Sequence, residues 1–148
     1  MINIYHSIPQ PPVYDGSDRY INLAQDYIKS IKYNFTGIQI YTINKKRPFS
    51  YLMKTAKEMI KYGMPIKCLE ACVLAMYLTC AMKNTVRFPL SFKTRVGNNT
   101  HIVLVIFSNG KYGAMGLSRK GDLMDKPLKY TSLTNLIKEF VRCYESST

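Results

Sequence analysis

Residues 68–78 constrain the fold of this chain more than any other segment. Apolar residues occupy nearly every side of the helix that this segment would form, and residues 71–78 are an uninterrupted apolar run. That run falls far short of the roughly 20 residues needed to cross a bilayer. Pro65 suits the first turn of a helix, where its missing N–H costs nothing. The segment therefore predicts a helix buried at the centre of a globular protein.

Two amphipathic helices and a strand are predicted before this central helix. Apolar residues at helical spacing predict one helix over residues 18–33, with Asp18 as its cap, and another from Ser50 to Gly63. β-branched and aromatic residues predict a strand over residues 38–43.

After the central helix the pattern changes to strands. Strands are predicted over residues 88–96, 101–107 and 112–117. Residues 97–99 predict a turn between the first two, and the Asn-Gly pair at 109–110 is a strong hairpin signal between the second and third.

One domain is expected from this order of elements. Ser132 predicts the start of a last helix with an apolar face. Residues 1–17, which contain three prolines, predict an irregular arm, and residues 18–148 a single domain. Helices followed by antiparallel strands and a closing helix are typical of the α+β class, with helices packed on a small antiparallel sheet.

The charge of the chain favours acidic partners. Lysine and arginine number 21 against 9 acidic residues, which gives a formal net charge of +12. A field of this sign attracts nucleic acid, anionic membranes or acidic protein segments, and composition does not choose among them. The N-terminus has neither a basic start nor a long apolar block, so we expect a protein that is neither secreted nor membrane-spanning.

The cysteines predict reduced thiols and no metal site. Cys68, Cys72 and Cys80 are spaced C-x3-C-x7-C, which is not a usual zinc spacing, and Cys143 stands apart. Without a secretory signal, free thiols are the default. We therefore expect neither a metal nor an organic cofactor.

Cys68 and His101 form a pattern that fits thiol catalysis. A cysteine near the start of a buried helix lies close to free backbone N–H groups and the positive end of the helix dipole, both of which stabilise a thiolate. His101 begins an apolar strand and could take the thiol proton. The residues alone leave two alternatives open: both groups belong to the core or a strand end, or Cys72, one turn further on, is the reactive thiol.

Several motifs, taken in order, resemble the vasohibin family. They are PIKCLEA at residues 65–71, RFPLSFKT at 87–94 and YGAMGLSRK at 112–120. Shorter matches lie at residues 33–37, 55–59 and 122–128. The resemblance covers roughly residues 18–144, and three motifs in this order are far more specific than a Cys…His pair.

The resemblance implies a fold, an activity and a triad. Vasohibins are cysteine peptidases with a transglutaminase-like, papain-like core that remove the C-terminal tyrosine of α-tubulin, usually with a small helical partner, the small vasohibin-binding protein. The resemblance implies that Cys68 is the nucleophile, His101 the base and Ser118 the third member of the triad. Asp122 and Asp125 are near enough in sequence to replace Ser118.

The resemblance also gives the basic residues a task. A carboxypeptidase must bind the terminal carboxylate of an acidic tail, and charge-assisted bonds from lysine and arginine do so. Lys67 and Arg119, next to the nucleophile and the triad serine, are implied for this role, and Tyr33 lines the site. Lys93 and the basic loop at residues 45–47 are weaker candidates for acidic side chains further back.

Three functions follow from the sequence. The first is a cytoplasmic cysteine carboxypeptidase that detyrosinates α-tubulin in association with the cytoskeleton. The second is an acyltransferase using the same thiol. The third is a non-catalytic basic module for microtubules or nucleic acid, with nucleic acid disfavoured because most tyrosines fall at core-periodic positions. Family members carry extra sequence on both sides, so we expect either a minimal, partner-free enzyme or an isolated core.

Overall fold

A computed structural model describes residues 8–44, 46–94 and 100–146. The elements, in chain order, are α1 (Arg19–Ile31), α2 (Phe49–Tyr62), α3 (Cys68–Leu78), β1 (Thr85–Lys93), β2 (Thr100–Ser108), β3 (Lys111–Met115), η2 (Gly121–Leu123), β4 (Lys126–Tyr130) and α4 (Leu133–Ser146). The predicted turn at residues 97–99, the first seven residues of the arm and Lys45 lie outside the described residues. No helix among those described is both long and apolar enough to cross a membrane.

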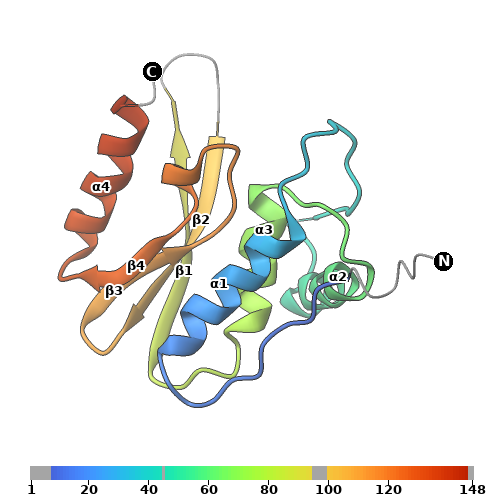
Figure 1. The fold of residues 1–148 in the computed structure, drawn as a ribbon, viewed down its shortest axis with the longest axis horizontal. Helices are drawn as coiled ribbons and strands as arrows, with labels where there is room; N and C mark the ends of the chain where they lie inside the picture. The colour runs from blue at the N-terminus through green and yellow to red at the C-terminus, as the bar shows by residue number, and fades with distance from the viewer. Residues whose placement is uncertain (1–7, 45, 95–99, 147–148) are drawn as a thin grey trace.

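The sheet forms the middle layer of the fold. Its four antiparallel strands lie in the order β1-β2-β3-β4. Figure 1 shows α4 on one face of the sheet, α1 and α3 on the other, and α2 beyond α3. The α+β class predicted from the sequence is therefore confirmed.

Alternation along β2 explains why both faces are covered. Val103 and Val105 pack in a core with α4, whereas Leu104 and Ile106 pack in the larger core with α1 and α3. Successive side chains of a strand point to opposite faces, so an unbroken apolar strand must be buried on both sides. The strand therefore sets the two-core plan of the molecule.

The central helix is buried as predicted, but it starts later. Ala71, Cys72, Leu74 and Ala75 have no exposed surface. The helix begins at Cys68, so Pro65 lies before it rather than in its first turn. The shift places Cys68 at the first helical position instead of about one turn inside.

The predicted helix boundaries were partly right. Gly63 ends α2 in the left-handed conformation that glycine favours at this position, as predicted. The helix begins at Phe49 after Pro48, so Ser50 is not its cap. Ser132 does cap α4, because its hydroxyl accepts the Asn135 N–H at 3.1 Å.

The prediction of a strand at residues 38–43 was wrong. The carboxamide of Asn34 accepts the Thr36 N–H at 3.0 Å and donates to the Ile38 carbonyl at 2.7 Å, so the chain turns back. Ile38 and Ile40 are exposed, and only Tyr41 in this segment is buried. Strand propensity without a partner strand did not produce a strand.

The predicted hairpin between β2 and β3 is confirmed. Ser108 pairs with Lys111, and Asn109 and Gly110 both have positive φ, 51° and 76°. Two positive φ values in a two-residue loop are what a type I′ turn requires. The sequence analysis missed β4, which pairs with β3 and completes the sheet.

Gly113 allows β3 and β4 to approach closely, which gives a first prediction. A Cβ at this position would lie 2.9 Å from the Lys126 carbonyl oxygen and 3.0 Å from the Leu128 nitrogen, both backbone atoms. We expect Gly113→Ala to lower the free energy of unfolding by about 1–3 kcal/mol, measured by urea denaturation. Gly121→Ala is the control, since a Cβ there meets nothing within 4 Å, and should change it by about 0.5 kcal/mol or less. Equal effects of the two substitutions would contradict the close approach.

Candidate active site

Cys68 lies at the N-terminal end of α3, half-buried. Lys67, the residue before it, has extended backbone dihedrals and serves as the helix cap. The first N–H groups of a helix have no partner within it, and together with the helix dipole they favour a negative charge at this end. The position can therefore hold a thiolate and, later, a developing oxyanion.

Glu70 fixes the start of α3, and the sequence analysis gave it no role. Its carboxylate accepts the Lys67 N–H at 3.3 Å and the Gln39 side-chain amide at 3.1 Å. The side chain is only 2% exposed. A glutamate three residues after the cap is the acidic half of a capping box, but Lys67 has no acceptor for the other half, so K-x-x-E at residues 67–70 does not match the sequence signature.

A short parallel bridge brings the end of α1 to the entry of α3. The Asn34 N–H donates to the Ile66 carbonyl at 2.7 Å, and the Ile66 N–H donates to the Lys32 carbonyl at 3.1 Å. Between these two bonds, Tyr33 pairs with Ile66, and Ile66 lies two residues before Cys68 in the sequence. The bridge therefore holds Tyr33 close to the start of α3.

His101 lies near the start of β2 and is 7% exposed. Its Nε2 atom lies 2.5 Å from the carbonyl oxygen of Leu123. Because a carbonyl only accepts, Nε2 carries the proton in the neutral ring and Nδ1 keeps its lone pair. Burial lowers the pKa of the imidazole, and the hydrogen bond to Leu123 opposes that shift in part. The side chain is thus arranged as a neutral base.

The loop between β3 and β4, residues 116–125, carries Ser118 and Arg119, and also the two aspartates considered in place of Ser118. Gln25 of α1 anchors its first residue, donating to the Gly116 carbonyl at 2.8 Å and accepting the Gly116 N–H at 3.0 Å. Lys29 forms an ion pair with Asp125 at 3.1 Å near its end. The sequence analysis missed Gln25, although a buried glutamine beside Ala24 and Ile28 on the inner face of α1 was a visible signal.

Within the part of the chain that the structure describes, neither Ser118 nor Asp122 nor Asp125 forms a hydrogen bond with the His101 imidazole. The Ser118 hydroxyl accepts the Lys120 N–H at 3.3 Å, and the hydrogen-bond partner of His101 is the Leu123 carbonyl. Asp125 pairs with Lys29, and Asp122 is exposed. The role of Ser118 stays a prediction, and the Leu123 carbonyl is a partner that the sequence analysis did not foresee.

Tyr33 and Arg119 meet in space although they are far apart in the sequence. The Arg119 guanidinium carbon lies 5.9 Å from the centre of the Tyr33 ring, within range of a cation–π contact. The Phe35 ring lies 4.8 Å from that of Tyr33. Of the basic loop, Arg47 lies over the Tyr51 ring at 4.8 Å, on α2.

A hollow of about 590 Å³ opens beside the start of β2, between the end of β1 and α4. Its lining residues are Phe92, Lys93, Thr94, Val141, Tyr144 and Glu145. Phe92 is the cross-strand neighbour of His101, and the Phe92 and Tyr144 rings are 5.8 Å apart. Lys93 therefore lies at the rim of this hollow, next to the histidine strand.

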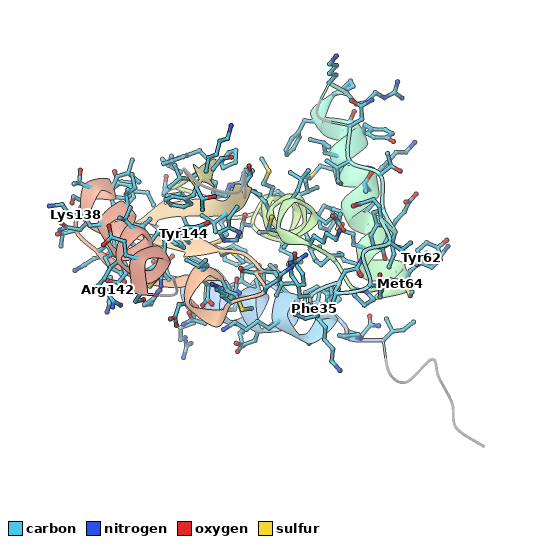
Figure 2. All side chains as sticks on the ribbon, turned by 90° about the horizontal axis from the view of Figure 1, so that it is seen from above. Phe35, Tyr62, Met64, Lys138, Arg142 and Tyr144 are labelled. Carbon is cyan, nitrogen blue, oxygen red and sulfur yellow. The ribbon has the colours of Figure 1, made fainter. Side chains whose placement is uncertain are left out.

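Tyr144 lines this hollow from α4. Burial raises the pKa of Tyr144, and the Cys68 thiol adds a smaller shift in the same direction. Figure 2 shows Tyr144 on the side of α4 that faces the strands, with Lys138 and Arg142 on its outer side. The sequence analysis treated Tyr144 only as a packing residue.

Cys72 lies in a different environment from Cys68. It is fully buried in α3, and burial, with a smaller contribution from Cys68, raises the pKa of its thiol to about 12. A thiol in this state stays protonated and poorly nucleophilic at neutral pH. Of the two cysteines, Cys68 is the one that lies half-buried at a helix start, where the sequence analysis expects the nucleophile.

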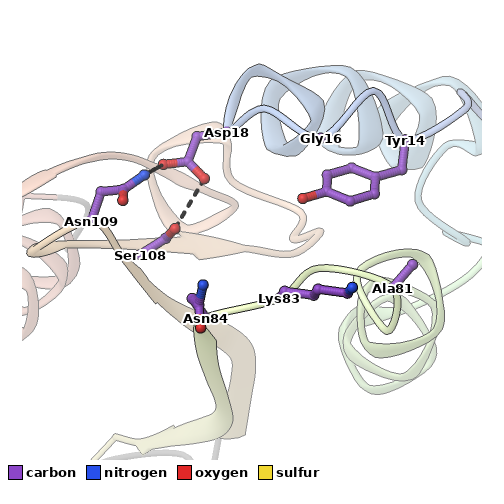
Figure 3. A pocket seen from close by; sticks show the side chains of 8 residues that line it. All are labelled: Tyr14, Gly16, Asp18, Ala81, Lys83, Asn84, Ser108 and Asn109. Carbon is purple, nitrogen blue, oxygen red and sulfur yellow. Dashed lines mark hydrogen bonds between the residues drawn. The ribbon is translucent and has the colours of Figure 1, made fainter.

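Two further observations delimit the site. Within residues 8–44, 46–94 and 100–146, no three histidine, cysteine or acidic side chains gather as metal ligands. A second hollow lies at the other end of the sheet, where Ser108 and Asn109 both donate to the Asp18 carboxylate (Figure 3). This hollow includes none of the predicted site residues, and Asp18 bonds there instead of capping α1 with its side chain.

Comparison with known proteins gives consistent results. The model of the family described as Vasohibin matches residues 3–148. The chain is 43% identical over 142 residues to tubulinyl-Tyr carboxypeptidase 1 of Mus musculus. The match covers 93% of this chain but 38% of that relative, so the chain spans well under half of its length.

The lowered pKa of His101 predicts a pH dependence of stability. The unfolded imidazole titrates near pH 6.5, and the folded one at a lower pH, so the folded state binds fewer protons between these values. The contribution of the neutral ring to the free energy of unfolding is fully present above about pH 6.5 and is lost as the pH falls through the folded pKa.

His101→Gln keeps a donor for Leu123 but does not titrate. We expect the wild type to lose more stability than this variant between pH 7.5 and pH 5, measured by urea denaturation. Parallel losses in the two proteins would contradict the burial of a neutral imidazole.

Proposed function

The chain belongs to the vasohibin family, and on that premise we propose that it is a cysteine carboxypeptidase that removes the C-terminal tyrosine of α-tubulin. The observation that carries the proposal is the 43% identity to a protein named as a tubulinyl-Tyr carboxypeptidase. Two features of the structure support it: Cys68 begins a buried helix, and the proton of the His101 ring is on Nε2, which leaves the Nδ1 lone pair to accept a proton.

The reaction begins with proton transfer from the Cys68 thiol to His101. The thiolate attacks the carbonyl carbon of the last peptide bond, and the backbone N–H of Cys68 stabilises the oxyanion. The imidazolium then donates its proton to the leaving tyrosine amine, which leaves the shortened tail as a thioester on Cys68. Water, deprotonated by His101, hydrolyses the thioester and restores the free thiol. The proposed core is transglutaminase-like, and the reaction needs no cofactor.

Basic residues around Cys68 provide the recognition of the substrate terminus. Lys67 directly precedes the nucleophile, and Arg119 lies over the Tyr33 ring on the opposite loop. We assign the terminal carboxylate to Lys67 and Arg119, and the tyrosine side chain to a contact with Tyr33. We assign to Lys93, which lines the hollow near the start of β2, the pairing with an acidic side chain further back in the tail.

A small helical partner and a cytoplasmic, cytoskeleton-associated location belong to the same proposal. Exposed apolar side chains lie on and after α2, among them Phe49, Tyr62 and Met64. Tyr62 and Met64 lie on the side of the molecule away from α4 (Figure 2). A helical partner would cover such side chains. Assaying the chain alone and with such a helix tests whether the partner is needed.

The test of the function uses two peptides that differ at one end. A peptide ending in Glu-Glu-Tyr should lose its last residue. The same peptide with an amidated end should react at least about ten- to a hundred-fold more slowly, because it loses the charge-assisted contacts to Lys67 and Arg119 and each is worth about that factor. Mass spectrometry of the products measures both rates. Cys68→Ala should abolish turnover of the acid peptide, and Cys72→Ala should retain it with lower stability. Equal cleavage of the two peptides, or turnover by Cys68→Ala, would refute the proposal.

The third member of the triad requires a separate test. We propose that Ser118 shares the orientation of His101 with the Leu123 carbonyl, since both lie on the loop that Gln25 anchors. Ser118→Ala should lower kcat by about ten- to a hundred-fold without a change in melting temperature. The same substitution at the exposed Ser91 is the control. If Ser118→Ala keeps full activity while Asp122→Asn or Asp125→Asn loses it, an aspartate is the third member.

A further inference from the structure

Lys126 connects α4 to the turn that holds the imidazole. Its ammonium donates to the Asp122 carbonyl at 2.7 Å and lies 3.3 Å from the Cys143 sulfur. It also lies 5.3 Å from the centre of the Phe140 ring. Cys143 and Phe140 are buried in the core between α4 and the sheet, so these contacts tie the ammonium to a rigid part of the protein.

The Asp122 carbonyl is next along the backbone to the carbonyl that accepts from His101. Asp122 and Leu123 both belong to η2. Because peptide units are planar, only the two backbone dihedrals of Leu123 separate the two carbonyl groups. A contact that fixes the Asp122 carbonyl therefore also restricts the direction of the Leu123 carbonyl.

Other contacts hold the turn but do not replace this one. The N–H groups of Leu123 and Met124 donate to the carbonyls of Lys120 and Gly121, which closes the turn internally. The Lys29–Asp125 ion pair ties the same loop to α1 on the other side. Lys126 joins the Asp122 carbonyl to Cys143 of α4, whereas Lys29 joins Asp125 to α1. The turn is therefore contacted by side chains from both faces of the sheet.

We propose that Lys126 is a positioning residue, which holds the η2 turn so that the Leu123 carbonyl keeps His101 with its proton on Nε2 and Nδ1 directed to accept. The effect of Lys126 on turnover rests on the proposed carboxypeptidase function. Its effect on the imidazole does not, and the two are measured separately.

The first measurement is the histidine tautomer. The chain has two histidines, His6 and His101, so nitrogen-15 NMR of the imidazoles gives a simple spectrum in which His6 serves as internal reference. Above pH 7 the wild type should show His101 mainly with its proton on Nε2. Lys126→Met, whose unbranched side chain is one atom shorter and has no donor, should give a mixture of tautomers. Lys126→Arg, which keeps a charged donor, should give the wild-type signal.

The second measurement is kinetic, with the acid peptide. We expect Lys126→Met to lower kcat by about ten- to a hundred-fold with little change in KM, because the base is misdirected while the carboxylate contacts remain. Lys129→Met is the matched control, since Lys129 is an exposed lysine of the same strand that lies over the Tyr130 ring. It should change neither kcat nor the spectrum.

The outcomes separate this proposal from the proposed function. If the wild type is inactive but Lys126→Met changes the His101 tautomer, the positioning role holds and the carboxypeptidase function fails. If Lys126→Met does not fold, Lys126→Gln, whose shorter neutral side chain cannot reach the turn in the same way, replaces it. A wild-type His101 spectrum in whichever of these variants folds would overturn the positioning role of Lys126.

Discussion

Burial of α3 is the constraint on which the rest of the structure depends. The helix is apolar on nearly every side, so it must be covered by the sheet, α1 and α2 together. Each fully buried aliphatic side chain contributes about 1.5–3 kcal/mol, which no exposed arrangement of this helix would provide. The same burial makes Cys72 an inert thiol and leaves Cys68, at the end of the helix, half-exposed. The position of the proposed nucleophile is thus a consequence of core formation.

The second half of the site is positioned by polar contacts instead of apolar packing. The loop at residues 116–125 crosses the end of the sheet, and Gln25 satisfies both backbone groups of Gly116 where they are buried. Leaving such groups unpaired costs about 1–3 kcal/mol each, so the contact fixes where the loop begins. From there the chain leads to η2, whose Leu123 carbonyl meets His101. The histidine is therefore oriented by a backbone group that depends on side chains from α1 and from β4.

Local signals in the sequence predicted the parts of the fold that local physics determines. The helices, the Asn-Gly hairpin and the Ser132 cap each depend on residues close together in the chain. Strand propensity wrongly predicted a strand at residues 38–43, which have no partner strand. It also missed β4, which is short and contains Pro127. In the candidate site, the residue types of Cys68 and His101 pointed to thiol chemistry, and their roles stay predictions. The Leu123 carbonyl was not, because every residue has a carbonyl and only the tertiary fold selects one.

A carbonyl in place of a carboxylate changes the electrostatics of the proposed site. A neutral acceptor fixes the tautomer of His101 but stabilises an imidazolium less than a carboxylate does, and burial already lowers the pKa of this ring. Before substrate binds, the imidazole of the proposed base is therefore neutral. Lys67 beside Cys68 and Arg119 over Tyr33 then favour negative charge at the same place. Such a site suits a substrate that brings its own carboxylate, because that anion neutralises the lysine and arginine and favours the imidazolium that must protonate the leaving amine.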